Sequence, residues 1–192
     1  MAGKYTSRNA EGDHIIKDND PRAIALLKDE HHRFRELFDA ANAAEGEALV
    51  PIAAEICLRL GVHMTIEEEL LYPALKPAIG SDEINEGIVE HASGKALVAE
   101  IEQLDGTEEL YKAKVHVLGE ETIHHIDEED RDLFEDAKQA HAEGKVDLDE
   151  LGDRLRARQA ELYDQVIETG EMGETDEARA EEIEVAEEAK VA

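Results

Sequence analysis

The sequence has little of what folded proteins use to build β-structure. Aromatic residues make up only 4% of the 192 residues, and there is no Trp. No stretch of useful length alternates apolar and polar residues, as a half-buried strand would. Ala, Leu, Glu and Ile dominate instead, and these residues favour helices, whose cores need few aromatic side chains. The composition therefore predicts an all-α protein.

Basic residues are also scarce. The chain has 20 Lys and Arg residues against 49 Asp and Glu residues, which gives a formal net charge of -29. Nucleic acids and anionic membranes carry charge of the same sign, so we expect neither as a partner. A solvated acidic surface is sufficient to explain the charge, and nothing in the sequence identifies a protein partner.

Cysteine and long apolar runs are nearly absent. The single cysteine, Cys57, excludes an internal disulfide and suits a reducing cytosol. No stretch approaches the roughly 18 or more apolar residues of a membrane span. The first residues lack the apolar core of a signal peptide. We therefore expect a soluble, cytoplasmic protein.

Apolar periodicity and turn residues divide most of the chain into four long helices. These helices are expected over about 21–43, 49–72, 81–105 and 107–144, and Tyr72-Pro73 should end or kink the second one. Short connections that contain Gly imply antiparallel neighbours. We therefore predict an up-down-up-down four-helix bundle over residues 20–144.

Three further segments flank the predicted bundle. Residues 1–19 have no sustained period and are expected to form an arm that lies over the domain. Residues 145–169 carry leucines at helical spacing and predict a shorter, C-terminal fifth helix. Residues 170–192 are acidic and rich in Ala, with little to bury, so we expect a disordered tail.

A short pattern of histidine and glutamate occurs twice. His63 and Glu67 are four residues apart, and so are His125 and Glu129, which places each pair on one face of a helix. The repeat extends further, since an apolar residue follows each His by eight positions and an aromatic residue by nine (Leu71 and Leu133, Tyr72 and Phe134). This repeated pattern indicates an internal repeat that contains a metal site.

Helical phase separates inward from outward histidines. His31 falls on the apolar stripe of the first helix, whereas His32 shares a face with charged residues. His63, His125 and their Glu partners also fall on apolar stripes, whereas His124 lies about a hundred degrees away from its stripe. On the third helix the predicted inward positions are Ile84, Ile88, His91, Lys95 and Val98.

A single histidine on an apolar face is more often a hydrogen-bonded core residue than a metal ligand. Here, however, four helices each offer one inward His, and two of them add an inward Glu. A buried carboxylate is costly unless it is paired or bound to metal. The combination predicts one shared metal site, while the remaining residues of Glu67–Glu69 and Asp127–Asp130 are expected to be solvated.

The donor set restricts the metal. Four imidazoles are too rich in nitrogen for calcium or magnesium, which prefer oxygen ligands. Six protein ligands exceed what one tetrahedral zinc uses. Two first-row metal ions that share carboxylates are the simplest arrangement, and iron is the metal that we expect.

These residues resemble the hemerythrin-like, or HHE cation-binding, family, bacterial type, over about residues 20–140. The resemblance rests on the inward His and Glu set and on the sequences after His63 and before Leu133. It implies a non-haem centre of two iron ions with an oxo or hydroxo bridge, and two bridging Glu ligands. The implied ligands are His31, His63, Glu67, His91, His125 and Glu129.

The chain departs from oxygen-carrying members of that family at Lys95. Those members have a second His four residues after the one at position 91, so the resemblance favours peroxide chemistry over reversible oxygen carriage. The leading hypothesis is a protein that binds O2, H2O2, NO or a similar small ligand and consumes peroxide, with Lys95 in a supporting role. A module that senses or sequesters iron or oxygen, without turnover, is the alternative.

Overall fold

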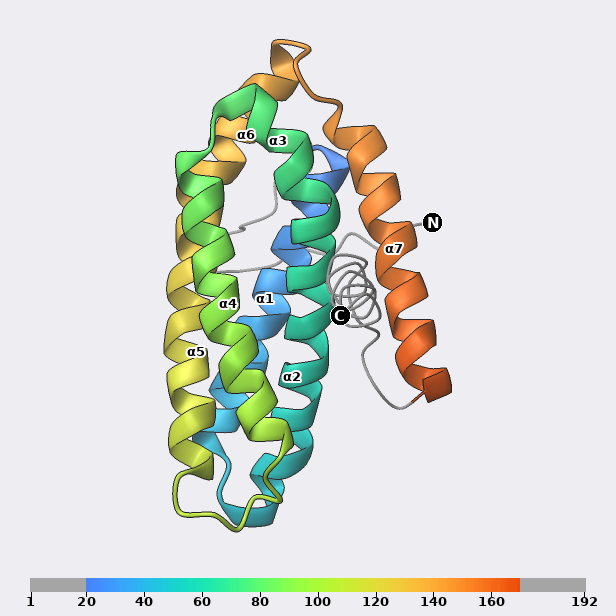
Figure 1. Ribbon diagram of the computed structural model, residues 1–192. Coiled ribbons are helices and arrows are strands. Elements are labelled where there is room, and N and C mark those ends of the chain that lie inside the picture. The colour runs from blue at the N-terminus through green and yellow to red at the C-terminus, as the bar shows by residue number, and fades with distance from the viewer. Residues whose placement is uncertain (1–19, 170–192) are drawn as a thin grey trace, which may run out of the picture.

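The structure, a computed structural model, describes residues 20–169 (Figure 1). Within that range all regular structure is helical and no strand occurs, which confirms the all-α prediction. The α-helices are α1 (Arg22–Ala43), α2 (Leu49–Ile66), α3 (Tyr72–Ile79), α4 (Asp82–Glu102), α5 (Tyr111–Glu128), α6 (Phe134–Ala142) and α7 (Leu148–Thr169). The expected N-terminal arm and acidic tail lie outside the described residues.

Two π-helices join consecutive α-helices into longer rods. η2 (Glu67–Leu71) connects α2 to α3, and η3 (Glu129–Leu133) connects α5 to α6, while a 3-10 turn, η1 (Gly46–Ala48), precedes α2. π-turns are rare and often occur at functional sites. Both begin at the Glu of the repeated His and Glu pattern, so the repeat in the sequence is also a repeat in backbone conformation.

Of the two outcomes expected at Pro73, an end or a kink of the second helix, the structure excludes the end. Pro73 lies in the first turn of α3, directly after η2, and the helix continues to Ile79. A proline inside an α-helix removes the N–H that would bond to the carbonyl four residues earlier. The π-turn before Pro73 already breaks this register, so the missing donor is accommodated there.

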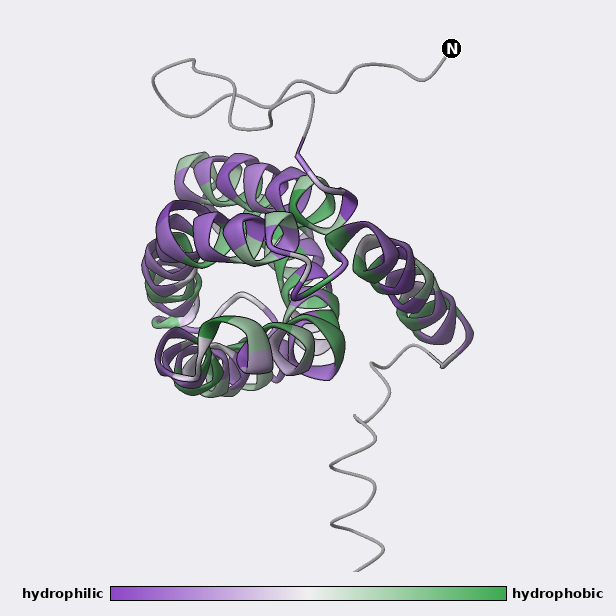
Figure 2. Cartoon of the chain, turned by 90° about the horizontal axis from the view of Figure 1, so that it is seen from above, coloured by the Kyte–Doolittle hydropathy of each residue, from purple (hydrophilic) through white to green (hydrophobic). Residues whose placement is uncertain are grey.

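Four rods form a closed ring. α1 contacts α2 and α5, and α4 contacts the same two helices. Figure 2, which views the chain along the rods, shows this ring with α7 outside it. α7 packs against the outer side of α1 and α2.

The apolar core has two parts, one toward each end of the ring. On α1 the first cluster ends at Leu27 and the second begins at Phe34. His31 lies between them and is fully buried. The level of the ring between the two clusters is therefore where the polar side chains are held, with tightly packed apolar side chains on both sides.

The helical stretch Gly46–Ile79 is long and apolar enough to cross a membrane. Of its most apolar window, 56% is buried inside the protein, where it contributes to both clusters of the core. A core helix passes the same test of length and composition, so this stretch is weak support for a membrane span.

Candidate metal centre

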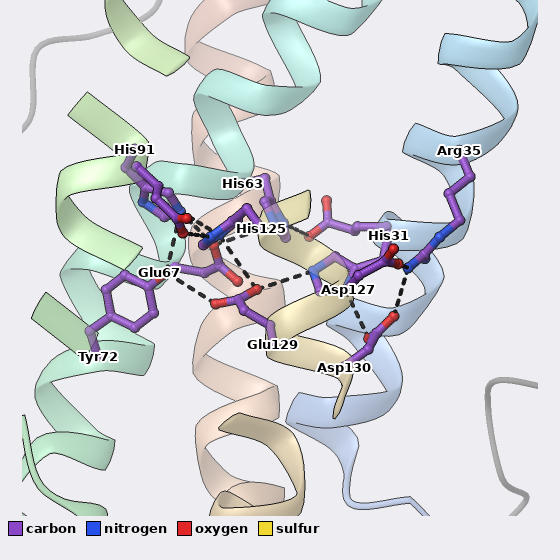
Figure 3. A network of polar contacts seen from close by, with 12 residues as sticks. His31, Arg35, His63, Glu67, Tyr72, His91, His125, Asp127, Glu129 and Asp130 are labelled. Carbon is purple, nitrogen blue, oxygen red and sulfur yellow. Dashed lines mark hydrogen bonds and ion pairs between the residues drawn. The ribbon is translucent and has the colours of Figure 1, made fainter. Parts of the chain in front are cut away.

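The structure brings all six predicted ligands together between the two clusters of the core (Figure 3). They come from four rods: His31 from α1, His63 and Glu67 from α2 and η2, His91 from α4, and His125 and Glu129 from α5 and η3. None is more than 7% exposed. Their donor atoms form two compact groups, one of His31, His63, Glu67 and Glu129 and the other of Glu67, His91 and His125.

Each carboxylate lies between imidazoles from two helices. Glu67 Oε2 is 3.3 Å from His63 Nε2 and 3.4 Å from His91 Nε2. Glu129 Oε2 is 3.4 Å from His31 Nε2 and 3.7 Å from His125 Nε2. Both Glu residues are thus placed where a bridging carboxylate would be, with one imidazole from each side.

Several of these inward atoms have no hydrogen-bond partner. They are Nε2 of His31 and His63, both carboxylate oxygens of Glu67, and Oε2 of Glu129. Buried polar atoms normally have partners, because leaving them unpaired costs free energy. A set of unpaired nitrogen and carboxylate oxygen atoms that converge on one place fits first-row transition metals. This observation supports a metal site independently of the sequence pattern.

A second carboxylate holds the outer nitrogen of each of the four inward histidines. The four Nδ1 contacts are His31 to Asp130 (3.0 Å), His63 to Glu30 (3.1 Å), His91 to Glu68 (3.0 Å) and His125 to Glu90 (2.7 Å). Each acid belongs to a different rod from its histidine, so the contacts run from α1 to α2, to α4, to α5 and back to α1. A carboxylate behind an imidazole fixes its orientation and leaves Nε2 free to bind metal.

The helical pattern did not predict these four acids, although their positions in the sequence carry a signal. Each stands next to a ligand in the chain: Glu30 and Glu90 precede His31 and His91, and Glu68 and Asp130 follow Glu67 and Glu129. Glu68 and Asp130 were expected to be solvated, and that expectation is wrong. A residue adjacent to an inward position leans toward the neighbouring helix, where it reaches the next histidine.

Further polar groups hold the supporting acids. Arg35 donates to Asp127 at 2.6 Å and to Asp130 at 3.0 Å. Gln159 of α7 donates to Glu30 at 2.6 Å, so α7 takes part in supporting His63.

Lys95 does not contact the ligands directly. Its Nζ donates to Glu68 Oε2 at 2.5 Å, and its side chain is 40% exposed. The other oxygen of Glu68 holds His91 Nδ1. Lys95 is therefore placed to act on His91 only through Glu68.

Tyr72 contacts the candidate centre, although the sequence pattern predicted it only as part of the repeat and as the end or kink of a helix. Its hydroxyl donates to Glu129 Oε1 at 3.0 Å and lies 3.2 Å from His91 Nε2. The hydroxyl has room because Gly87 faces it: a Cβ atom at that position would come within 2.8 Å of the Tyr72 oxygen. Gly87 is buried and Ile88 is 42% exposed, so the prediction that Ile88 points inward is wrong.

The charges of the site oppose and outweigh the effect of burial. Burial alone would lower the pKa of His31, but the hydrogen bond from its Nδ1 to Asp130 and the negative charges of Asp130 and Glu129 raise it to about 10. In the same way, Glu67 and Glu68 raise the pKa of His91 to about 9. Burial alone would raise the pKa of Glu129, but His125 and His31 hold it well below its usual range. In the metal-free protein His31 and His91 are therefore protonated, and their positive charges balance those of the nearby carboxylates.

We expect the metal-free protein to lose stability as the pH rises from 6.5 to 8.5. Histidines with pKa values of about 9 and 10 in the folded state and about 6.5 in the unfolded state stabilise the fold fully below pH 6.5. That contribution falls as the pH rises toward the folded pKa values. Thermal unfolding of the metal-free chain at pH 6.5, 7.5 and 8.5 measures the trend.

The metal-loaded chain is the control for that pH series, because the metal takes the place of the titrating proton on Nε2 and the bound imidazole is neutral. Its unfolding temperature should not fall between pH 6.5 and 8.5. A metal-free chain whose stability is constant or increases over this range would contradict the assigned protonation.

Comparison with known proteins agrees with this geometry. The family model of the Hemerythrin HHE cation binding domain matches residues 22–137. The chain belongs to this family. The crystal structure of a hemerythrin HHE cation binding domain-containing protein from Mycobacterium kansasii shares the fold at 23% identity, with a TM-score of 0.61 over 78% of this chain and 94% of that chain. No curated protein matches the sequence.

The family match and the two His and Glu groups together identify the HHE domain as a metal-binding domain. The match ends within α6, so α7 lies beyond the residues that define the family. The donation from Gln159 shows that α7 nevertheless supports the site.

The HHE domain has an apolar cavity of about 220 Å³ between α4 and α5. Leu60, Met64, Leu118 and Ile126 line it, and so do the predicted ligands His63, His91 and His125. A cavity of this size and character suits a small ligand that carries no charge.

Proposed function

We propose that this protein is a cytoplasmic, non-haem di-iron protein with an up-down-up-down four-helix bundle, and that it binds O2, H2O2, NO or a similar small ligand. Consumption of peroxide in a protective role is its leading activity. The observation that carries the proposal is the pair of buried donor groups that share Glu67. Two groups that share one carboxylate suit two neighbouring ions of the same kind.

The residues present fit iron. Four imidazoles and two carboxylates would hold two such ions, with His31 and His63 on one side, His91 and His125 on the other, and Glu67 and Glu129 between them. Iron supplies redox chemistry when bound, since two ions can together exchange two electrons with a small ligand. The supporting acids keep all four Nε2 atoms directed inward for this purpose.

Tyr72 holds a proton at the site. Burial and the charges of Glu129 and Glu67 raise the pKa of its hydroxyl well above its ordinary value of 10. The hydroxyl therefore stays protonated at all physiological pH values and can donate a hydrogen bond to an oxygen atom of a ligand beside Glu129. Donation of a proton or hydrogen bond in this way is a common contribution to catalysis.

Peroxide turnover is the activity to measure. The iron-loaded protein should convert two H2O2 into one O2 and two H2O, which an oxygen electrode detects. The metal-free chain and His63→Ala should release no oxygen above background. His32→Ala is the matched control, since His32 neighbours His31 in sequence but pairs with Glu36 outside the centre.

An iron-loaded protein that binds O2 reversibly over many cycles and ignores peroxide would contradict the enzymatic proposal. The site would then serve binding alone, as in a module that senses or sequesters iron or oxygen.

Replacing Tyr72 with Phe should leave two irons per chain but slow peroxide turnover by about tenfold or more, because the aromatic ring keeps its packing while the proton at Oη is lost. Iron content and the initial rate of oxygen release should be measured on the same sample. If Tyr72→Phe turns over peroxide at the parent rate, the hydroxyl has no part in the reaction.

A further inference from the structure

The six ligands are buried, so an ion that fills the centre must pass between helices. His31 and Glu67 are 0% exposed, while His125, at 7%, is the most exposed of the six. Two hollows of the described chain reach His125. One is the apolar cavity, and the other is a polar pocket of about 230 Å³ between α4 and the α5–η3 junction.

The polar pocket is strongly acidic. Six of its lining residues carry carboxylates, and no Lys or Arg lines it (Glu83, Glu86, Glu90, Glu128, Glu129, Asp132). Burial raises the pKa of Glu83, and the negative charges of Asp136, Asp132 and Glu86 add to the effect. A pocket lined by one sign of charge attracts the opposite sign and raises its local concentration.

A buried residue of the candidate metal centre lines this pocket. Glu129 lines the pocket, is only 4% exposed, and has one carboxylate oxygen, Oε2, without a hydrogen-bond partner. The same oxygen lies 3.4 Å from His31 Nε2 and 3.7 Å from His125 Nε2, inside the candidate centre. The acidic pocket therefore reaches a side chain of the candidate metal centre.

A second group of possible ligands stands where the two hollows adjoin. Glu90, His124 and Glu128 offer ligand atoms that all lie within 4.8 Å of one another. His124 lines the apolar cavity, Glu128 lines the acidic pocket, and Glu90 lines both. Glu90 also accepts a hydrogen bond from Nδ1 of His125 at 2.7 Å, so this group touches the support of the buried centre. Its imidazole favours a transition metal over calcium or magnesium.

We propose that Glu90, His124 and Glu128 form a separate entry site, which captures ferrous iron from solution and passes it through the acidic pocket to Glu129 and His125. This proposal rests on the proposed function, since it assumes that the buried centre takes up iron. The iron ion stays ferrous throughout this transfer. It first exchanges water for the ligands of the entry site, and then exchanges those ligands for the ligands of the buried centre. In this proposal the exposed His124, which faces away from the centre, binds the incoming iron ion.

The test compares two double variants of the full chain. His124→Ala/Glu128→Gln removes two ligands of the entry site and leaves Glu90 in place to hold His125. His116→Ala/Glu120→Gln is the matched control, because that pair also lies on α5 at the same spacing and the same 3.6 Å separation, but lines neither hollow. Each metal-free protein is mixed with ferrous iron without oxygen, and the iron that becomes protected from a chelator is followed in time.

We expect the entry-site variant to load iron at least about tenfold more slowly than the parent and the control, in line with the effect of charge focusing on association rates. All three should reach the same final content of two irons per chain. The parent rate should fall as salt is added, and the rate of the entry-site variant should fall less. In addition, the iron-loaded parent and control should bind one extra zinc ion weakly by calorimetry, and the entry-site variant should not.

Equal loading rates for both double variants, or no extra zinc ion on the iron-loaded parent, would overturn the entry site while leaving the di-iron centre intact. A parent chain that takes up no iron at all would overturn both proposals. The final iron content therefore distinguishes failure of the centre from failure of the route to it.

Discussion

Glu67→Gln is expected to reduce bound iron from about two ions per chain to well below one. Glu67 belongs to both groups of ligand atoms, so one substitution weakens both positions at once. Glutamine keeps the shape of the side chain but replaces a charged bridging oxygen with a neutral amide, which is a poor metal ligand. Iron assay of the purified protein measures the loss.

The stabilisation by metal should disappear along with the iron. A bound ligand raises the unfolding free energy in proportion to the logarithm of its concentration over its Kd, so the parent should unfold at a higher temperature with iron than without. The iron-dependent increase should be absent in Glu67→Gln.

Glu69→Gln is a suitable control for this substitution, because Glu69 lies two residues away and pairs with Arg158 of α7. It should keep both irons. Full iron content in Glu67→Gln would show that the shared carboxylate is not a ligand.

Gly152→Ala is expected to destabilise the protein by about 1–3 kcal/mol, the usual range for overpacking a tightly packed contact. α7 crosses α1 so closely at this point that a Cβ atom would lie 2.4 Å from the backbone nitrogen of Ala23 and 2.6 Å from the carbonyl carbon of Arg22. Backbone atoms cannot rotate away, so α7 must move outward. Alanine would otherwise favour the helix by about 1 kcal/mol.

Gly94→Ala is the matched control for the packing of α7. Gly94 is also inside a helix, but the nearest atom to its added Cβ would be Met64 Sδ at an ordinary 3.5 Å. That variant should be as stable as the parent or more stable by up to about 1 kcal/mol. Urea unfolding of both variants decides the matter, and equal stability of the two would show that α7 is not held against α1 as described.

The inward positions of the six His and Glu residues could be predicted from the sequence because burial follows the helical period. The stripe that contains Ile24, Leu27 and His31 faces the ring, and the structure places His31 inside and His32 outside it. The same reasoning preferred His125 over His124, which is 68% exposed at its side chain. Periodicity was sufficient where large apolar residues mark the buried face.

The helical period gave a wrong prediction where a small residue marks the buried face and where the helix changes its pitch. Gly87 has no side chain to count as apolar, so Ile88 took its place in the predicted stripe, although the ring needs a gap there for the Tyr72 hydroxyl. The π-turn that starts at Glu67 adds a residue to the turn and rotates the side chains of the next helix, α3, about the axis of the rod. Tyr72 therefore reaches the centre, and Pro73 does not end the helix.

The supporting acids escaped prediction for a different reason. Glu30 and Glu90 lie beside the apolar stripe, and their targets are on other helices. A helical wheel describes one helix at a time, so it gives no information on a contact that depends on how two helices are placed. The closed order of these contacts around the ring follows only from the tertiary structure.

Anomalous X-ray scattering from crystals of the iron-loaded protein, collected on both sides of the iron absorption edge, tests the central claim most directly. We expect two iron peaks per chain, one beside His31 and His63 and the other beside His91 and His125, with Glu67 reaching both. One peak, peaks at the zinc edge in place of iron, or no peak among these six residues would contradict the di-iron centre.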